Sequence, residues 1–106
     1  MFFELRQYSI KEGQMERWVK WMDEVLIPYQ VSNGMVVVGS WFASEENQYI
    51  WIRRFESEAE RERLYAEVYE NDYWRLEAKP LVDEMLDRDK GLTITRMQAS
   101  PLSILR

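Results

Sequence analysis

Five side chains near the start and in the middle of the sequence have the chemistry to hold a small anionic molecule: Arg6, Tyr8, Tyr49, Trp51 and Arg53. A guanidinium group in a cavity of low dielectric constant binds a carboxylate, an enolate or a phenolate strongly. Phenol hydroxyls orient a ligand or act as weak acids with an ordinary pKa of about 10, and an indole stacks on a flat molecule. We therefore predict that these five residues bind a ligand and that Trp51 borders the cavity.

Each of these residues also has a purely structural interpretation. Arg6 can form an ion pair with Glu4, or with another acidic neighbour across a sheet, and simply neutralise it. Tyr8 and Tyr49 can be core aromatic residues whose hydroxyls are hydrogen-bonded, and tryptophans commonly fill a core or a dimer interface. The sequence leaves both interpretations open and assigns no catalytic residue.

The composition narrows the class of protein. A chain of 106 residues with 46% hydrophobic content is predicted to form one domain, residues 1–106. It has 14 basic and 19 acidic residues and a formal charge of −5, and the basic residues are scattered, so nucleic acid is not expected as a partner. No apolar run reaches the roughly 20 residues of a membrane span, and no leader-like segment opens the chain, so we expect a cytoplasmic protein with no membrane partner.

The absence of both cysteine and histidine excludes several kinds of site. Disulfides, thiolate nucleophiles, imidazole bases and the usual zinc or haem ligands are all excluded together. The carboxylates Asp83, Glu84 and Asp87 do not have the spacing of a calcium-binding loop, so we expect no metal site and no cofactor.

Hydrophobic periodicity predicts the order strand, helix, strand, strand, helix, strand. Residues 2–10 alternate between polar and apolar as a strand does. Residues 14–30 follow a helical period, and Pro28 and the sequence "SNG" at 32–34 should end this helix. Residues 35–43 and 47–55 are predicted to form a hairpin. Ser57 and Glu60 form a capping box that starts the second helix. Pro80 should kink or split the further helical stretch that holds Trp74. Residues 92–97 form the last strand. This order is typical of an α+β, ferredoxin-like fold with an antiparallel four-stranded sheet and both helical segments on one face.

The alternation within the strands suggests which face meets the helices. We expect Phe3, Leu5, Ile50 and Ile52 to point toward the helices. The opposite face would then carry rings and charged groups: Glu4, Arg6, Tyr8, Tyr49, Trp51, Arg53 and Phe55. Because a monomer seldom leaves such a patch in water, we predict a homodimer in which two sheets pack face to face as a dimeric α/β barrel.

Four blocks of the sequence together carry a family resemblance: the opening "FELRQYSIKEG", the stretch "VGSWFASEENQYIWIRRFESEAERERLY", "YW" at 73–74 and "SPL" at 100–102. On these blocks the chain resembles the NIPSNAP family of the dimeric α/β-barrel superfamily. The opening is similar to the family's N-terminal pattern, with Phe3 in place of its tyrosine and Glu12 in place of its proline, the long stretch is similar to its hairpin and second-helix entry, and the two short blocks match later landmarks. The resemblance implies the fold and the homodimer. No imidazole role follows from it, because Trp51, Ile52 and Arg53 stand where many members carry His-Leu-Trp.

Three hypotheses about function follow, and the sequence does not decide whether the protein is an enzyme. The first is a protein that holds a small aromatic or hydrophobic anion in the cavity between the two sheets of the dimer. The second is a cofactor-independent monooxygenase, isomerase or cyclase acting on an aromatic or polyketide substrate, in which Arg6 or Arg53 stabilises an enolate and Tyr8 or Tyr49 moves a proton. The third is a purely structural role through the dimer surface.

Overall fold

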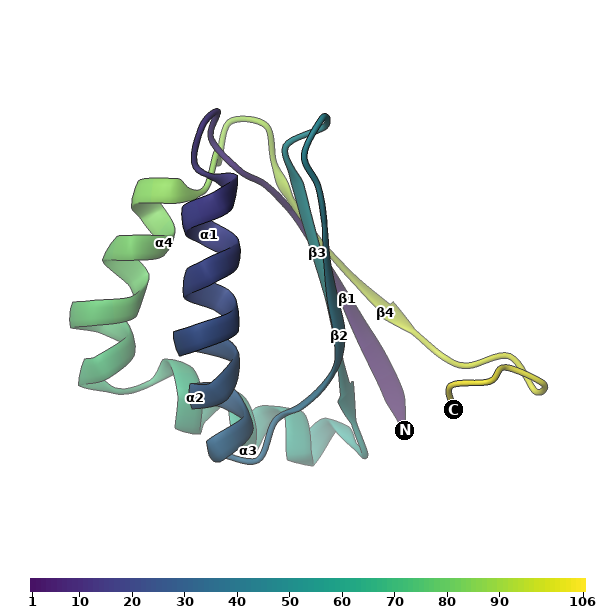
Figure 1. Cartoon of the computed structure of the whole chain (residues 1–106). Coiled ribbons are helices and arrows are strands. Elements are labelled where there is room, and N and C mark those ends of the chain that lie inside the picture. Colours follow the sequence, from purple (N-terminus) through teal and green to yellow (C-terminus); the bar gives the residue numbers. More distant parts are fainter.

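Four strands form one antiparallel sheet in the order β2-β3-β1-β4. In the computed structural model, which describes residues 1–106, the strands are β1 (Phe2–Ser9), β2 (Val36–Ala43), β3 (Gln48–Phe55) and β4 (Leu92–Met97). All the helical segments lie on one side of this sheet (Figure 1). The predicted ferredoxin-like arrangement of a four-stranded antiparallel sheet with helices on one face is confirmed.

The helices form two stretches that each contain a wider π-helical turn. The first consists of α1 (Met15–Trp21), η1 (Met22–Leu26) and α2 (Ile27–Ser32), and the second contains η2 (Trp74–Ala78) followed by α4 (Lys79–Met85). Between them lies α3 (Glu58–Tyr69), which starts at the predicted capping box: the Ser57 hydroxyl accepts a hydrogen bond from the Glu60 backbone N–H at 3.1 Å.

Two prolines lie inside these helical stretches without ending them. The first stretch ends at Ser32, so the expected end at the sequence "SNG" is confirmed, but Pro28 does not end it, and the second stretch also continues past Pro80. In both places the N–H of the residue before the proline bonds five residues back, from Ile27 to Met22 and from Lys79 to Trp74. The wider turn gives room to a proline ring that would otherwise clash with the carbonyl four residues earlier.

The two faces of the sheet are reversed relative to the sequence prediction. Tyr8, Tyr49 and Trp51 lie in one buried cluster with Trp18 and Met22 of the first helical stretch, so they point toward the helices. The residues of β1 and β3 that are directly opposite one another share a face, which places the even-numbered residues of β1 with the odd-numbered residues of β3. The ring-bearing and charged side chains therefore fill the layer between the sheet and the helices.

Mutual neutralisation explains why this face is the inner one. Glu4 and Arg53 are cross-strand partners and bond at 2.6 Å, which offsets much of the cost of removing each charge from water. Arg53 is 0% exposed and Glu4 is 2% exposed. A hydropathy pattern counts each charged residue alone and so assigns both to the face away from the helices.

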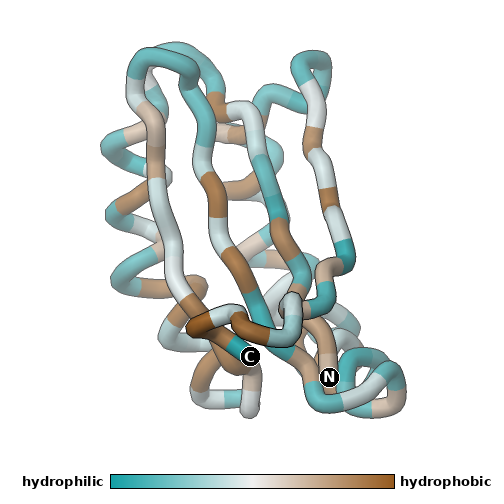
Figure 2. Tube along the Cα trace, turned by 90° about the vertical axis from the view of Figure 1, so that its right-hand side faces the viewer, coloured by the Kyte–Doolittle hydropathy of each residue, from teal (hydrophilic) through white to brown (hydrophobic).

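The other side of the sheet carries no helix, and we call it the bare face (Figures 1 and 2). The pairing of the strands places most of its residues, and Val38 is placed there because it lines a pocket on this side. The bare face consists of Phe3, Leu5, Gln7, Val36, Val38, Trp41, Ile50, Ile52, Arg54, Thr93, Thr95 and Met97. Only the C-terminal tail, residues 98–106, crosses in front of this face, near the end of the sheet where β1 begins (Figure 2). None of the helices has the length and apolar character that crossing a membrane requires.

The capping box at Ser57 gives a first test of the local structure. Replacing Ser57 with alanine removes the acceptor for the Glu60 N–H, so the free energy of unfolding should fall by about 1 kcal/mol in urea titrations. Ser44→Ala, in the hairpin turn, is the matched control because its hydroxyl makes no hydrogen bond. Equal stability of the two variants would show that the cap does not stabilise α3.

Candidate functional site

A cavity of about 180 Å³ lies between the sheet and the helices of a single chain. Nine of its 11 lining residues are hydrophobic, and the remaining two are arginines. The lining comes from β1, β3 and β4, from both helical stretches, from α3 and from the segment between α4 and β4: Arg6, Tyr8, Trp18, Leu26, Trp51, Tyr69, Trp74, Val82, Leu86, Arg88 and Leu92. No carboxylate lines the cavity, so its wall carries positive charge in an aromatic setting.

Arg6, from the middle of β1, is held in place by three neighbours. Its Nε donates to the Tyr8 hydroxyl at 2.6 Å, and its Nη1 donates to Glu4 Oε1 and to the Tyr65 hydroxyl, each at 3.2 Å. Nη2 makes no hydrogen bond, although only 12% of the side chain is exposed. The hydroxyl proton of Tyr8 also has no acceptor within the chain. Two donors are therefore free beside the cavity.

Glu4 is the only carboxylate that pairs with the two buried guanidinium groups. Its Oε1 accepts from Arg53 at 2.6 Å as well as from Arg6, and its Oε2 accepts from Tyr65 at 2.6 Å. Arg61, which is more exposed, adds a longer contact of 3.4 Å. The inner charges of Glu4, Arg6 and Arg53 thus sum to one excess positive charge.

Arg53 is enclosed by polar groups and rings rather than open to the cavity. Its Nη1 donates to Gln30 Oε1 at 2.9 Å and to the Tyr69 hydroxyl at 2.8 Å, and its Nη2 donates to Tyr65 at 2.9 Å. The guanidinium carbon also lies 4.8 Å from the centre of the Trp51 ring. This environment holds the residue rigid, and it leaves Arg53 outside the cavity lining.

The buried network shifts its titrating groups away from neutral pH. Burial alone would raise the pKa of Glu4, but the charge of Arg53 and hydrogen bonds from Tyr65 and Arg53 outweigh it and lower the pKa to about 2. Burial raises the pKa of Tyr65 to about 12, and burial also raises the pKa of Tyr8. None of these three groups is therefore poised to exchange a proton near pH 7.

The structure separates the five predicted ligand-binding residues into two groups. Arg6, Tyr8 and Trp51 line the cavity, as expected for Trp51, while Tyr49 and Arg53 are buried without lining it. Burial raises the pKa of Tyr49 to about 12, and its ring packs edge-on against Trp18. The predicted position of all five between two sheets is wrong, because their side chains lie under the helices of their own chain.

Both interpretations of Arg6 hold at once, because it pairs with Glu4 and also lines the cavity.

The sequence prediction missed Tyr65, Tyr69, Trp74 and Arg88. The spacing of Tyr65 and Tyr69 by four residues on the helix that begins after Ser57 was the available signal, since it places two hydroxyls on one helix face.

Arg88 is the second cation of the cavity wall, and it lies between α4 and β4. Its Nη2 donates to Asp83 Oδ1 at 2.6 Å, and Lys79 donates to the other oxygen of Asp83 at 2.7 Å. Glu84 pairs with Arg17 in the same way. The carboxylates of Asp83 and Glu84 therefore serve ion pairs with basic side chains.

Comparison with known proteins agrees with this architecture. The sequence profile of the NIPSNAP family matches residues 3–101. The chain belongs to the NIPSNAP family. No curated protein matches the sequence significantly.

Solved structures of other NIPSNAP proteins share the fold over nearly the whole chain. A NIPSNAP family protein of unknown function from Agrobacterium tumefaciens is 24% identical, with a TM-score of 0.87 covering 100% of this chain and 94% of the other. An uncharacterised NIPSNAP domain protein from Burkholderia xenovorans is 16% identical, with a TM-score of 0.80 covering 97% and 98%. An antibiotic biosynthesis monooxygenase is 15% identical, with a TM-score of 0.68 covering 95% and 100%. At these identities the likeness concerns the fold alone.

The low pKa of Glu4 predicts how stability depends on pH. The pKa falls from 4.5 in the unfolded chain to about 2 in the folded chain, so the stabilisation is complete above pH 4.5 and is lost as pH falls toward 2. The shift corresponds to about 3 kcal/mol. Urea unfolding between pH 2 and pH 7 should show this loss.

Glu4→Gln should weaken that acid-dependent loss and lower the free energy of unfolding at pH 7 by about 3 kcal/mol or more, because two guanidiniums lose their counter-charge. Glu62→Gln, at an exposed position of α3, should behave as the unsubstituted protein. An unchanged pH profile in Glu4→Gln would contradict the proposed neutralisation.

Proposed function

We propose that this NIPSNAP protein binds a small aromatic or hydrophobic anion in the cavity between the sheet and the helices of each chain. The observation that carries the proposal is the partly unpaired guanidinium of Arg6 in the wall of that cavity. A carboxylate or enolate oxygen that accepts a hydrogen bond from Nη2 of Arg6 would also accept one from the Tyr8 hydroxyl. Both donors are already oriented by the network around Glu4.

Electrostatics favours an anion over a neutral ligand. Arg6 and Arg53 share one carboxylate, so the buried network lacks one negative charge. An unbalanced charge in a low-dielectric interior is costly, and a ligand that supplies the missing charge is correspondingly favoured. The protein as a whole carries a charge of −5, so the positive cavity wall is a local feature.

The volume and lining favour a ligand with one ring. An apolar protein cavity of about 150 Å³ holds a benzene molecule, and this cavity of about 180 Å³ leaves room for a ring with a small acidic group. Trp51 and Trp74 provide ring surfaces for stacking and for edge contacts. We therefore propose single-ring aromatic carboxylates, or compounds of similar shape and charge, as the ligand class.

Catalysis is the second proposal, and the fold shared with an antibiotic biosynthesis monooxygenase motivates it. Arg6 would then stabilise an enolate or phenolate that forms from the substrate. The pKa directions of Glu4, Tyr8 and Tyr65 favour binding over proton transfer, because none of these groups titrates near pH 7. Measured turnover of a bound compound would favour catalysis instead.

We further propose that two copies pair through their bare faces. Leu5, Ile50 and Ile52 occupy the centre of this face, and Trp41 is 50% exposed on β2. A monomer seldom leaves a large apolar sheet face in water. Pairing would place the two ligand cavities on the outer sides of the sheets, one under each helix layer.

Ligand binding is tested by titrating benzoate into the protein and recording tryptophan fluorescence and heat. Saturable binding is expected, and Arg6→Gln should bind benzoate at least about tenfold more weakly because a charge-assisted hydrogen bond is lost. Benzamide, which has the same ring and no charge, should bind weakly or not at all.

Arg63→Gln is the control, since Arg63 lies on α3 and its side chain is 60% exposed. Equal affinity of the unsubstituted protein and Arg6→Gln for benzoate would contradict the proposal. Circular dichroism of each variant would verify that a loss of binding is not a loss of folding.

The pairing predicts a solution mass of about twice 12.9 kDa by light scattering. Leu5→Glu places a charge at the centre of the bare face and should give a monomer. Leu76→Glu changes a leucine that is 64% exposed on the helical side, and it should leave the dimer intact. A monomeric unsubstituted protein at micromolar concentration would refute the pairing.

A further inference from the structure

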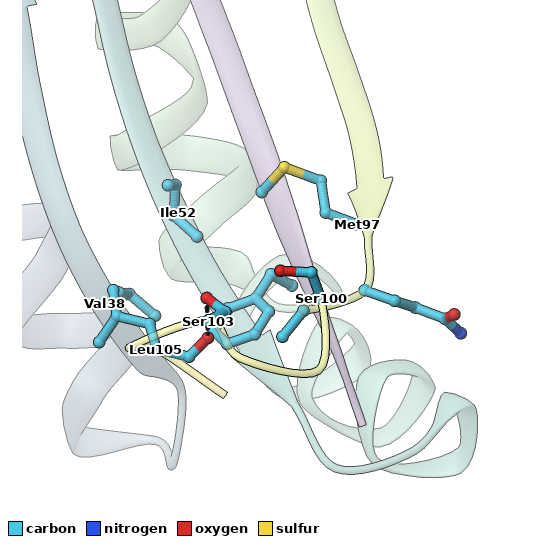
Figure 3. A pocket seen from close by; sticks show the side chains of 9 residues that line it. Val38, Ile52, Met97, Ser100, Ser103 and Leu105 are labelled. Carbon is cyan, nitrogen blue, oxygen red and sulfur yellow. Dashed lines mark hydrogen bonds between the residues drawn. The ribbon is translucent and has the colours of Figure 1, made fainter.

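The C-terminal tail has an apolar side toward the sheet and a second apolar side toward solvent. On the inner side, Ser103 and Leu105 line a pocket of about 230 Å³ with Phe3, Val38 and Ile52 of the bare face (Figure 3). Phe3 is 8% exposed although no helix covers it. The tail therefore packs on its own sheet through these contacts.

The outer side of the tail is unusually exposed for its chemistry. Leu102 is 91% exposed and Ile104 is 98% exposed, the two highest values among the large hydrophobic residues. Scattered exposed leucines are normal on a surface, but these two alternate with Ser103 and Leu105, which line the pocket although Leu105 remains 58% exposed. The segment folds back in a turn at Pro101 and Leu102 and bends at Ile104, so neither Leu102 nor Ile104 lines the pocket against the sheet.

The tail makes few contacts with its own sheet, so these contacts offset little of the conformational entropy that ordering the tail costs. Its hydrogen bonds are internal: Ser103 N–H to Ser100 O at 3.0 Å, Ser103 hydroxyl to Leu105 O at 2.8 Å, and Arg106 to Pro101 O at 2.8 Å. Figure 3 shows the second of these at the rim of the pocket. A segment with no hydrogen bonds to the rest of the domain is weakly ordered unless other contacts hold it. A second surface on the outer side would supply the missing contacts.

We infer that the tail is clamped between the sheets of two copies, with Ser103 and Leu105 on its own sheet and Leu102 and Ile104 on the second copy. This inference rests on the proposed pairing of the bare faces. The symmetry of a two-fold dimer lets both tails make the same contact. Each tail would then hold the other copy as well as its own sheet.

The distribution of charge favours a second copy of this acidic chain as the partner that covers the bare face and the tail. The chain has 19 acidic residues, yet the bare face contains no carboxylate and one guanidinium, that of Arg54. Residues 98–105 contain no charged side chain. Two copies with a charge of −5 each can therefore approach through this surface with the least repulsion.

Area gives a second argument for the same occupant. Four strands about 4.8 Å apart and about 27 Å long offer a footprint of about 500 Å². A stable interface typically needs about 800 Å² from each partner. The tail crosses in front of one end of this footprint (Figure 2), and the exposed side chains of Leu102 and Ile104 add apolar surface there.

The test compares dimer dissociation constants, measured by sedimentation of the full chain. Leu102→Ser combined with Ile104→Ser should weaken the dimer at least about tenfold, because two apolar contacts with the second copy are lost. Both side chains are exposed in a single copy, so these substitutions should not affect its folding. Leu76→Ser, on the helical side, should leave the constant unchanged.

Two results separate this inference from the pairing on which it rests. If the unsubstituted protein is a dimer and the double variant dissociates at the same concentration, the clamped tail is refuted while the pairing stands. If the unsubstituted protein is a monomer, both are refuted.

Thiol labelling gives an independent reading, because the chain has no cysteine of its own. Ile104→Cys should react with fluorescein-5-maleimide at least about tenfold faster when Leu5→Glu is present to separate the copies. Equal rates in the dimeric and the monomeric background would show that Ile104 stays open to solvent, or to another kind of partner, and would overturn the inference.

Discussion

A carboxylate shared by two buried guanidinium groups is the interaction on which the rest of this structure depends. Glu4 bonds to Arg53 at 2.6 Å and to Arg6 at 3.2 Å, and all three lie between the sheet and the helices. Buried ions are tolerated only when they are paired and hydrogen-bonded. The tyrosines of α3 and Gln30 of α2 supply those hydrogen bonds, so the helices must pack on this face of the sheet.

The same interaction connects the fold to the proposed function. Three neighbours hold Arg6 rigid and leave its Nη2 unpaired beside a cavity lined by rings. A rigid donor and an excess positive charge form a preorganised site for an anion. Binding at this site costs less conformational entropy than binding at a mobile arginine would. The bare face then has no role in the cavity and is available for pairing two copies.

The sequence predicted the fold well and the inner face wrongly. Strand and helix positions, the hairpin and the capping box at Ser57 all followed from local patterns that the structure reproduces. The helix through Pro28 needed a π turn, and the inner face needed the pairing of Glu4 with Arg53, 49 residues apart. Local periodicity cannot predict such a pair, because the pairing depends on which strands become neighbours in the sheet. Residue types did identify Arg6, Tyr8 and Trp51 as cavity residues.

The most direct measurement of the central claim is an NMR titration that follows the guanidinium nitrogens of a ¹⁵N-labelled protein with benzoate. The account predicts that the Arg6 resonances shift saturably while those of Arg63, exposed on α3, do not move. Shifts spread evenly over the exposed arginines, or Arg6 resonances that stay in place at saturating benzoate, would contradict it.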